Sequence, residues 1–178
     1  MRNVARLKMG YYPLPESEGT KLRSLPSYSL PASVMDPCVG QGTALQIVTK
    51  DAPARLYGVE LDAERARIAT ARGIETVQGN TFDAIARSES FSLLYLNPPY
   101  DFEIGSIANR RMEAVFLEHT YCWLTMQGVL VFVIPFERLH DWLRSMRKQT
   151  HNEAAHGVGT CRRACRSQFP RIDFVAPQ

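Results

Sequence analysis

The chain has 178 residues, of which 45% are hydrophobic and 22% charged, and its formal net charge is +3. This composition fits one globular domain with a buried core and excludes disordered and fibrous classes. The longest apolar run, residues 129–136, is far too short to cross a bilayer, and the basic N-terminus lacks the apolar stretch of a signal peptide. We therefore expect a cytoplasmic protein with no membrane partner.

The chain alternates short apolar runs with amphipathic stretches. After an N-terminal segment rich in Pro, Ser and Gly, the pattern predicts strands at 33–35, 55–59, 75–78, 92–96 and 129–134, and helices at 43–50, 63–72 and 110–124. Asp62 and Gly73 are placed as the N-cap and the C-terminal stop of the second helix. A stripe on the third helix indicates core packing; its members are Met112, Val115, Phe116, His119 and Trp123. Strands separated by single helices favour an α/β fold with a mostly parallel sheet and helices on both faces.

A glycine-rich turn, DPCVGQGT at residues 36–43, joins the first strand to the first helix. Such a turn lets a ligand approach the backbone near a helix N-terminus, although an ordinary tight turn is the alternative. Glu60 ends the second strand, where α/β nucleotide sites place an acid on ribose hydroxyls. Leu45 replaces the third small residue of a dinucleotide fingerprint, and no P-loop sequence follows. The pattern therefore predicts a ribose-bearing cofactor without phosphates, one end of which a carboxylate such as Asp36 can hold.

The fourth strand runs into Asn97-Pro98-Pro99-Tyr100. Proline lacks the backbone donor that a strand needs, so the strand must stop at Asn97. Ligands in open α/β sheets bind beyond the carboxyl ends of the strands, which makes this polar corner a candidate site. A simple tight turn is the alternative.

Taken in order, residues 36–43, Glu60 and residues 97–100 resemble the cofactor loop, ribose acid and catalytic motif of amino-methyltransferases that use S-adenosyl-L-methionine, in particular N6-adenine DNA methyltransferases. The similarity covers about residues 8–137 and implies a Rossmann-like methyltransferase fold. Residues 10–15 resemble the segment that covers the methionine end of the cofactor in such enzymes.

The resemblance implies a role for each matched position. Asp36 faces the methionine amino group, Gly40 and Gly42 give the backbone access to the cofactor, and Glu60 accepts both ribose hydroxyls. Asn80 stands where the family often has an acid that contacts adenine. The full expected cofactor set is Tyr12, Asp36, Cys38, Gly40, Gly42, Thr43, Glu60, Leu61, Asn80, Thr81 and Asn97.

The expected catalytic residues are Asn97, Pro98, Pro99 and Tyr100. An exocyclic amine is a poor nucleophile because its lone pair is delocalised. The Asn97 side-chain oxygen and the Pro98 carbonyl can accept its two hydrogens and aim the nitrogen at the methyl group. Tyr100 can stack on a planar, flipped-out base. We favour adenine in DNA as substrate; an RNA base amine, a glutamine side chain, or a catalytically inactive cofactor- or nucleic-acid-binding module are the alternatives.

The sequence divides into an N-terminal cofactor-covering segment (1–31), a methyltransferase core (32–143) and a basic, atypical tail (144–178). Similar enzymes add two strands with an antiparallel edge after the fifth, whereas here a helix is expected at 137–147 and only 172–175 could form a strand. We expect the C-terminal edge strands to be missing and the fifth strand to be an unprotected edge, and we hypothesise a truncated or frame-altered C-terminus.

The chain contains no visible target-recognition domain. We expect nucleic acid, DNA rather than RNA, as partner, with the basic tail able to contact phosphates or to form a solvated surface. A homodimer or a partner chain would supply target recognition. The four cysteines are expected to be reduced, and the order and spacing of the His and Cys pairs within 151–165 fit no standard zinc finger, so no metal is expected.

Overall fold

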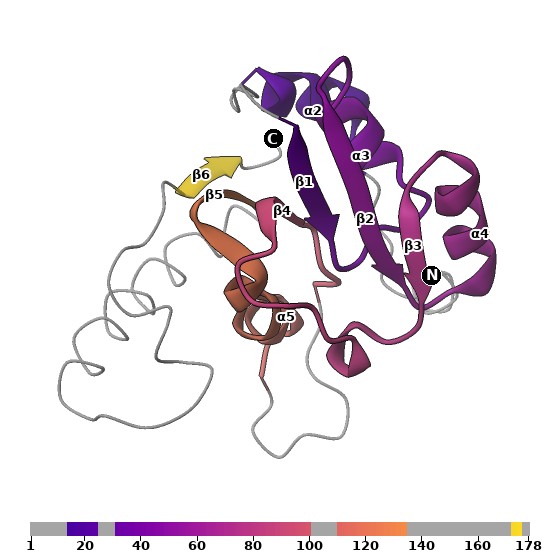
Figure 1. Cartoon of the computed structure of the whole chain (residues 1–178), viewed down its shortest axis with the longest axis vertical. Helices are drawn as coiled ribbons and strands as arrows, with labels where there is room; N and C mark the ends of the chain where they lie inside the picture. Colours follow the sequence, from indigo (N-terminus) through magenta and orange to yellow (C-terminus); the bar gives the residue numbers. More distant parts are fainter. Residues whose placement is uncertain (1–13, 25–30, 101–109, 135–171, 176–178) are drawn as a thin grey trace, which may run out of the picture.

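The computed structural model of the chain describes residues 14–24, 31–100, 110–134 and 172–175. Tyr12, the predicted helix at 137–147 and the His and Cys pairs within 151–165 lie outside these residues. The described elements, in chain order, are α2 (Glu16–Arg23), β1 (Ala32–Asp36), α3 (Thr43–Val48), β2 (Ala54–Glu60), α4 (Ala63–Ala71), β3 (Glu75–Gln78), η1 (Thr81–Asp83), β4 (Phe91–Leu96), α5 (Met112–Thr120), η2 (Tyr121–Trp123), β5 (Leu124–Val133) and β6 (Ile172–Val175) (Figure 1).

The strands form one sheet in the order β3-β2-β1-β4-β5-β6, and all neighbouring pairs are parallel. The order reverses between β1 and β4, so the connections that follow these two strands leave in opposite directions. A crevice forms at such a switch point, beyond the carboxyl ends of the strands. This arrangement confirms the predicted Rossmann-like α/β fold. It places the candidate motifs together at the carboxyl ends of the strands.

Helices cover both faces of the sheet, as Figure 1 shows. Alternate residues of β4 point to opposite faces: Leu93 and Tyr95 pack in the core beneath α2, α3 and α4, and Leu94 and Leu96 pack in the core beneath α5. All four side chains are buried, which is the pattern of a strand covered on both sides. None of the helices in the described part of the chain has both the length and the apolar character needed to span a bilayer.

The first four strands begin and end within one residue of their predicted positions. The cap of α4 is also confirmed, because the Asp62 side chain accepts a hydrogen bond of 2.9 Å from the Arg65 backbone N–H, and Gly73 follows the helix with φ of 81°. Of the predicted core stripe, Phe116 on α5 and Trp123 on η2 are buried.

Two elements differ from the prediction. The predicted helix at 110–124 is too long, because α5 ends at Thr120 and β5 begins at Leu124, which pairs with Phe91. The ladder then shifts before Leu93 meets Val129, so residues 125–128 form an irregularity that hides the start of the strand in the sequence. The helix α2 was not predicted, although its Leu22 is fully buried against the sheet core.

The expectation of an unprotected fifth strand is wrong. The strand β6 pairs with β5 in parallel, from Leu130 with Ile172 to Val133 with Val175. Three of its four residues, Ile172, Phe174 and Val175, are of the β-branched and aromatic types that favour strands. Residues 172–175 of the predicted tail are therefore part of the sheet.

Candidate active site

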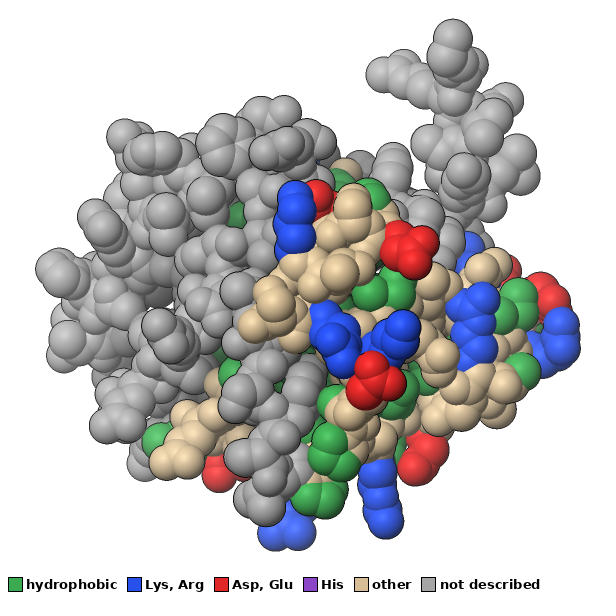
Figure 2. All heavy atoms as spheres, turned by 90° about the horizontal axis from the view of Figure 1, so that it is seen from above, with side chains coloured by type: hydrophobic (Ala, Val, Ile, Leu, Met, Phe, Trp, Pro, Cys, Tyr) green, Lys and Arg blue, Asp and Glu red, His purple; other side chains and the backbone are tan. Residues whose placement is uncertain are grey.

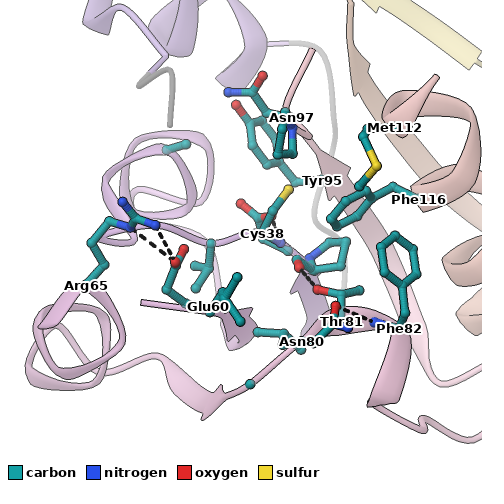
Figure 3. A pocket seen from close by; sticks show the side chains of 18 of the residues that line it. Cys38, Glu60, Arg65, Asn80, Thr81, Phe82, Tyr95, Asn97, Met112 and Phe116 are labelled. Carbon is teal, nitrogen blue, oxygen red and sulfur yellow. Dashed lines mark hydrogen bonds and ion pairs between the residues drawn. The ribbon is translucent and has the colours of Figure 1, made fainter. Parts of the chain in front are cut away.

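One pocket lies at the carboxyl ends of β1, β2 and β4, at the switch point of the sheet. It brings together nine of the predicted site residues: Asp36, Cys38, Thr43, Glu60, Leu61, Asn80, Thr81, Asn97 and Pro99. Figure 3 shows five of these side chains converging from loops that are far apart in the sequence: Cys38, Glu60, Asn80, Thr81 and Asn97. Leu14, from the segment predicted to cover the cofactor, also lines the pocket.

Neither of the two loop glycines, Gly40 and Gly42, is among the residues that line the pocket. Gly42 has φ of 81°, and a Cβ atom there would lie 2.3 Å from the Ile74 Cδ1 atom. Gly42 is thus required by backbone conformation and by close packing against Ile74. Gly40, with φ of 57°, donates its N–H to Glu60 Oε2 at 2.9 Å.

Asp36 ends β1 and is 2% exposed. Its Oδ1 atom accepts the Cys38 N–H at 2.9 Å, which closes a turn around Pro37. Burial raises the pKa of Asp36 to about 7, because desolvation disfavours the charged form. A cationic ligand in the pocket would be an effective partner for this carboxylate.

Cys38 lines the pocket, and Figure 3 shows its sulfur pointing toward Tyr95 and Asn97. Burial, followed by the charge of Asp36, raises the pKa of the Cys38 thiol well above its ordinary value. The thiol therefore stays protonated near neutral pH. A thiolate nucleophile is excluded at this position.

Glu60 ends β2 and is almost completely surrounded by donors. Its Oε2 atom accepts from Gly40 N, and its Oε1 atom accepts from Asp62 N at 2.8 Å and from Arg65 Nε and Nη2 at 3.1 and 2.8 Å. Arg65 lines the pocket and was not predicted. The only sequence signal for it is its place in the first turn of the helix that follows Glu60.

The floor of the pocket comes from η1. Thr81 Oγ1 donates a hydrogen bond to the Pro37 carbonyl, which ties η1 to the glycine loop. Asn80 caps η1, because its side-chain oxygen accepts the Phe82 N–H at 3.2 Å. The amide of Asn80 is thus partly engaged within the chain.

An aromatic wall, missed by the sequence analysis, joins η1 to α5. Phe82 packs against Phe116 with ring centroids 4.8 Å apart and against His119 at 5.5 Å. Phe82, Phe116 and Met112 line the pocket. His119 also packs against Trp123, which agrees with its predicted role as a packing residue of the helix.

The Asn-Pro-Pro-Tyr corner follows β4 as predicted. Asn97 and Pro99 line the pocket, whereas Pro98 and Tyr100 are not among the lining residues. The Tyr100 hydroxyl lies 2.7 Å from Asn97 Oδ1 and 3.2 Å from the Val133 carbonyl. Burial raises the pKa of Tyr100, so the hydroxyl stays protonated and acts as a donor. It contacts the very oxygen expected to hold the substrate amine.

Within residues 14–24, 31–100, 110–134 and 172–175, no group of three or more His, Cys, Asp or Glu side chains is arranged to hold a metal ion. The His and Cys pairs between 151 and 165 lie outside this set.

Solved methyltransferase structures share the fold. The methyltransferase subunit of a type I restriction-modification system from Streptococcus thermophilus is 19% identical, with a TM-score of 0.53 over 67% of this chain and 33% of the subunit. A methyltransferase from Geobacter sulfurreducens, in complex with S-adenosyl-L-homocysteine, is 12% identical, with a TM-score of 0.52 over 73% of this chain and 53% of that one. A geranyl diphosphate methyltransferase in complex with S-adenosylmethionine is 14% identical, with a TM-score of 0.51 over 74% and 57%.

This chain spans only 33% to 57% of the length of these three proteins, and at such low identity the likeness shows the fold alone. No curated protein matches the sequence. The sequence profile of an uncharacterised methyltransferase family, DUF6094, matches residues 1–154. Because this match covers most of the chain, and because the fold is that of known methyltransferases, the chain belongs to this methyltransferase family.

Proposed function

We propose that the chain uses S-adenosyl-L-methionine to methylate an exocyclic amino nitrogen, and that adenine N6 in DNA is its target. The observation that carries the proposal is the convergence of Asp36, Glu60 and Asn97 on one pocket, each from the end of a different parallel strand. The family match supports methyl transfer. The Asn-Pro-Pro-Tyr corner supports a planar amine as the acceptor.

The residues of the pocket fit this cofactor. Asp36 offers a buried carboxylate to the methionine ammonium, whose charge would favour the ionised form of Asp36 again. Glu60 offers carboxylate oxygens to the ribose hydroxyls. Leu61 and Asn80, which follow β2 and β3, line the pocket and would border the adenine end in this proposal. When bound, the cofactor supplies an electrophilic methyl group on a sulfonium.

The chain's own contribution to the transfer is positioning. The Asn97 side-chain oxygen accepts one amino hydrogen of the substrate, and the Pro98 carbonyl accepts the second, which directs the nitrogen lone pair into the pocket. The rigid prolines hold these acceptors in place. Tyr100 lies at the same corner and is the proposed stacking residue for a planar base. Because burial raises the pKa of the Cys38 thiol, a thiolate of Cys38 has no part in the proposed transfer.

The proposal assigns target recognition to contacts beyond the described surface. On the face that Figure 2 shows, the Lys and Arg side chains of the described residues are interspersed with Asp and Glu side chains. Several arginines of the described residues form ion pairs, among them Arg23, Arg67 and Arg110. We therefore propose a second copy or a partner chain that adds contacts to DNA. The likeness to a restriction-modification methyltransferase subunit supports this choice.

Tritiated methyl transfer to DNA, RNA and protein, followed by digestion and mass spectrometry of the product, tests the proposal. Wild-type chain should form N6-methyladenine in DNA. Asn97→Ala should reduce transfer at least about a hundredfold, since an acceptor used mainly in the transition state is lost, and should leave cofactor binding nearly intact. Gln78→Ala is the matched control, because it removes an exposed amide at the end of β3 that does not line the pocket.

The outcomes separate the substrates. Label in RNA or on protein glutamine, with none in DNA, would identify that acceptor as the substrate instead of adenine in DNA. Cofactor binding without transfer to any acceptor would identify an inactive binding module. Equal transfer by Asn97→Ala and Gln78→Ala would contradict the proposed role of Asn97.

A further inference from the structure

One of the two carboxylate oxygens of Glu60, Oε1, is already filled by donors of the chain itself. A carboxylate has about four lone-pair sites in two oxygens. Glu60 accepts four hydrogen bonds: one each from the Gly40 and Asp62 backbones, at 2.9 and 2.8 Å, and two from the Arg65 guanidinium, at 3.1 and 2.8 Å. Three of these bonds fall on Oε1 and one on Oε2, so Oε1 is filled and only one site, on Oε2, remains for a diol that donates two hydrogen bonds.

The backbone donors and the arginine differ in whether they can move away from Glu60. Gly40 is buried in the loop between β1 and α3, and Asp62 caps α4, so their N–H groups are fixed by the fold. Arg65 sits in the first turn of α4 on a long side chain, and its exposed fraction is 15%. Figure 3 shows its guanidinium approaching Glu60 from the rim of the pocket. Arg65 is the donor that can leave.

We propose that Arg65 sets the affinity of the cofactor site: its guanidinium occupies the oxygen of Glu60 that a ribose hydroxyl requires and is displaced when the cofactor binds. This inference rests on the proposed function, in which Glu60 accepts the ribose hydroxyls. It explains why a nearly buried carboxylate is stable without ligand, since an unpaired charge there would be costly. Arg65 then acts as an internal competitor for the ribose.

Calorimetric titration with S-adenosylhomocysteine tests this inference. Arg65→Met keeps the aliphatic stem and removes the competing donors. We expect it to bind about tenfold more tightly than wild type, which corresponds to about 1.4 kcal/mol. Arg67→Met is the matched control, because Arg67 lies on the same helix and pairs with Glu64 in solvent, away from the pocket. Its affinity should equal that of wild type.

Thermal unfolding supplies a second readout. Without ligand, Arg65→Met should unfold at a lower temperature than Arg67→Met, because Glu60 loses its cationic partner; saturating S-adenosylhomocysteine should raise its midpoint more than that of wild type. If Arg65→Met does not fold, Arg65→Gln takes its place. A neutral amide donates more weakly to Glu60 than a guanidinium, so Arg65→Gln should bind with an affinity between those of wild type and Arg65→Met.

Each outcome decides the inference. Binding by wild type together with equal or weaker binding by the Arg65 variants would overturn it and leave the proposed function standing, since Arg65 would then be a neighbour or a direct ligand contact. Binding only by the Arg65 variants would support it. Binding by none of the folded chains would overturn the proposed function, and this inference with it.

Discussion

The two carboxylates of the pocket are in contrasting environments. Glu60 is surrounded by four donors, two of them from a guanidinium. Asp36 is buried beside a thiol that stays protonated, and burial raises its pKa to about 7. One carboxylate is thus satisfied within the chain, whereas the other is poised for an external cation. Asp36 is therefore the residue whose titration should be visible in the stability of the chain.

Replacing Asp36 should change the pH dependence of unfolding. The folded-state pKa of about 7 exceeds the ordinary value of 3.8, so the folded chain holds a proton that the unfolded chain has released. The free energy of unfolding should therefore fall as pH rises toward 7, by about 3 kcal/mol between pH 5 and pH 8. Asp36→Asn should lack this decline, which urea unfolding at the two pH values would measure. The same slope in both proteins would contradict the assignment.

At the scale of single elements, the glycine loop is fixed by its contact with the segment that follows α4. Gly42 and Gly73 share φ of 81°, yet they differ in surroundings. A Cβ atom on Gly42 would lie 2.3 Å from Ile74, whereas one on Gly73 would have no neighbour within 4 Å. The pair therefore separates the cost of backbone conformation from the cost of close packing.

Alanine substitutions at these two glycines should differ in effect. Gly73→Ala should lose about 1 kcal/mol of stability from its left-handed conformation alone. Gly42→Ala should lose about 2–4 kcal/mol, because overpacking against Ile74 is added. Chemical denaturation measures both values. Equal losses would mean that the contact with Ile74 does not hold the loop.

Sequence patterns predicted the parts of the site that belong to strand ends. Asp36, Glu60 and Asn97 could be placed together because parallel strands carry their carboxyl ends to one edge. Arg65 and Phe116 could not be assigned to the pocket from the sequence. Whether their side chains line it depends on the orientation of α4 and α5 about their own axes against the sheet, which no local sequence pattern specifies. The start of β5 was hidden by residues 125–128, and β6 paired in parallel across a long separation in sequence.

At the scale of the whole molecule, the sheet is continuous from β3 to β6, and the pocket lies at its switch point. The chain spans only part of the length of the solved methyltransferases that share its fold. Under the proposed function, the pocket would hold the cofactor and a second copy or a partner chain would select the target. The pocket should bind S-adenosyl-L-methionine, because every later step of the proposed reaction depends on this cofactor.

Calorimetric titration with S-adenosylmethionine of wild type, Glu60→Ala and Glu64→Ala tests that claim most directly. Glu64 is an exposed acid on α4, paired with Arg67 and outside the pocket, and serves as the control. Wild type and Glu64→Ala should bind alike, and Glu60→Ala should bind at least about tenfold more weakly because two charge-assisted hydrogen bonds are lost. Folded wild-type chain that binds no S-adenosylmethionine, or binding that Glu60→Ala leaves unchanged, would contradict the account.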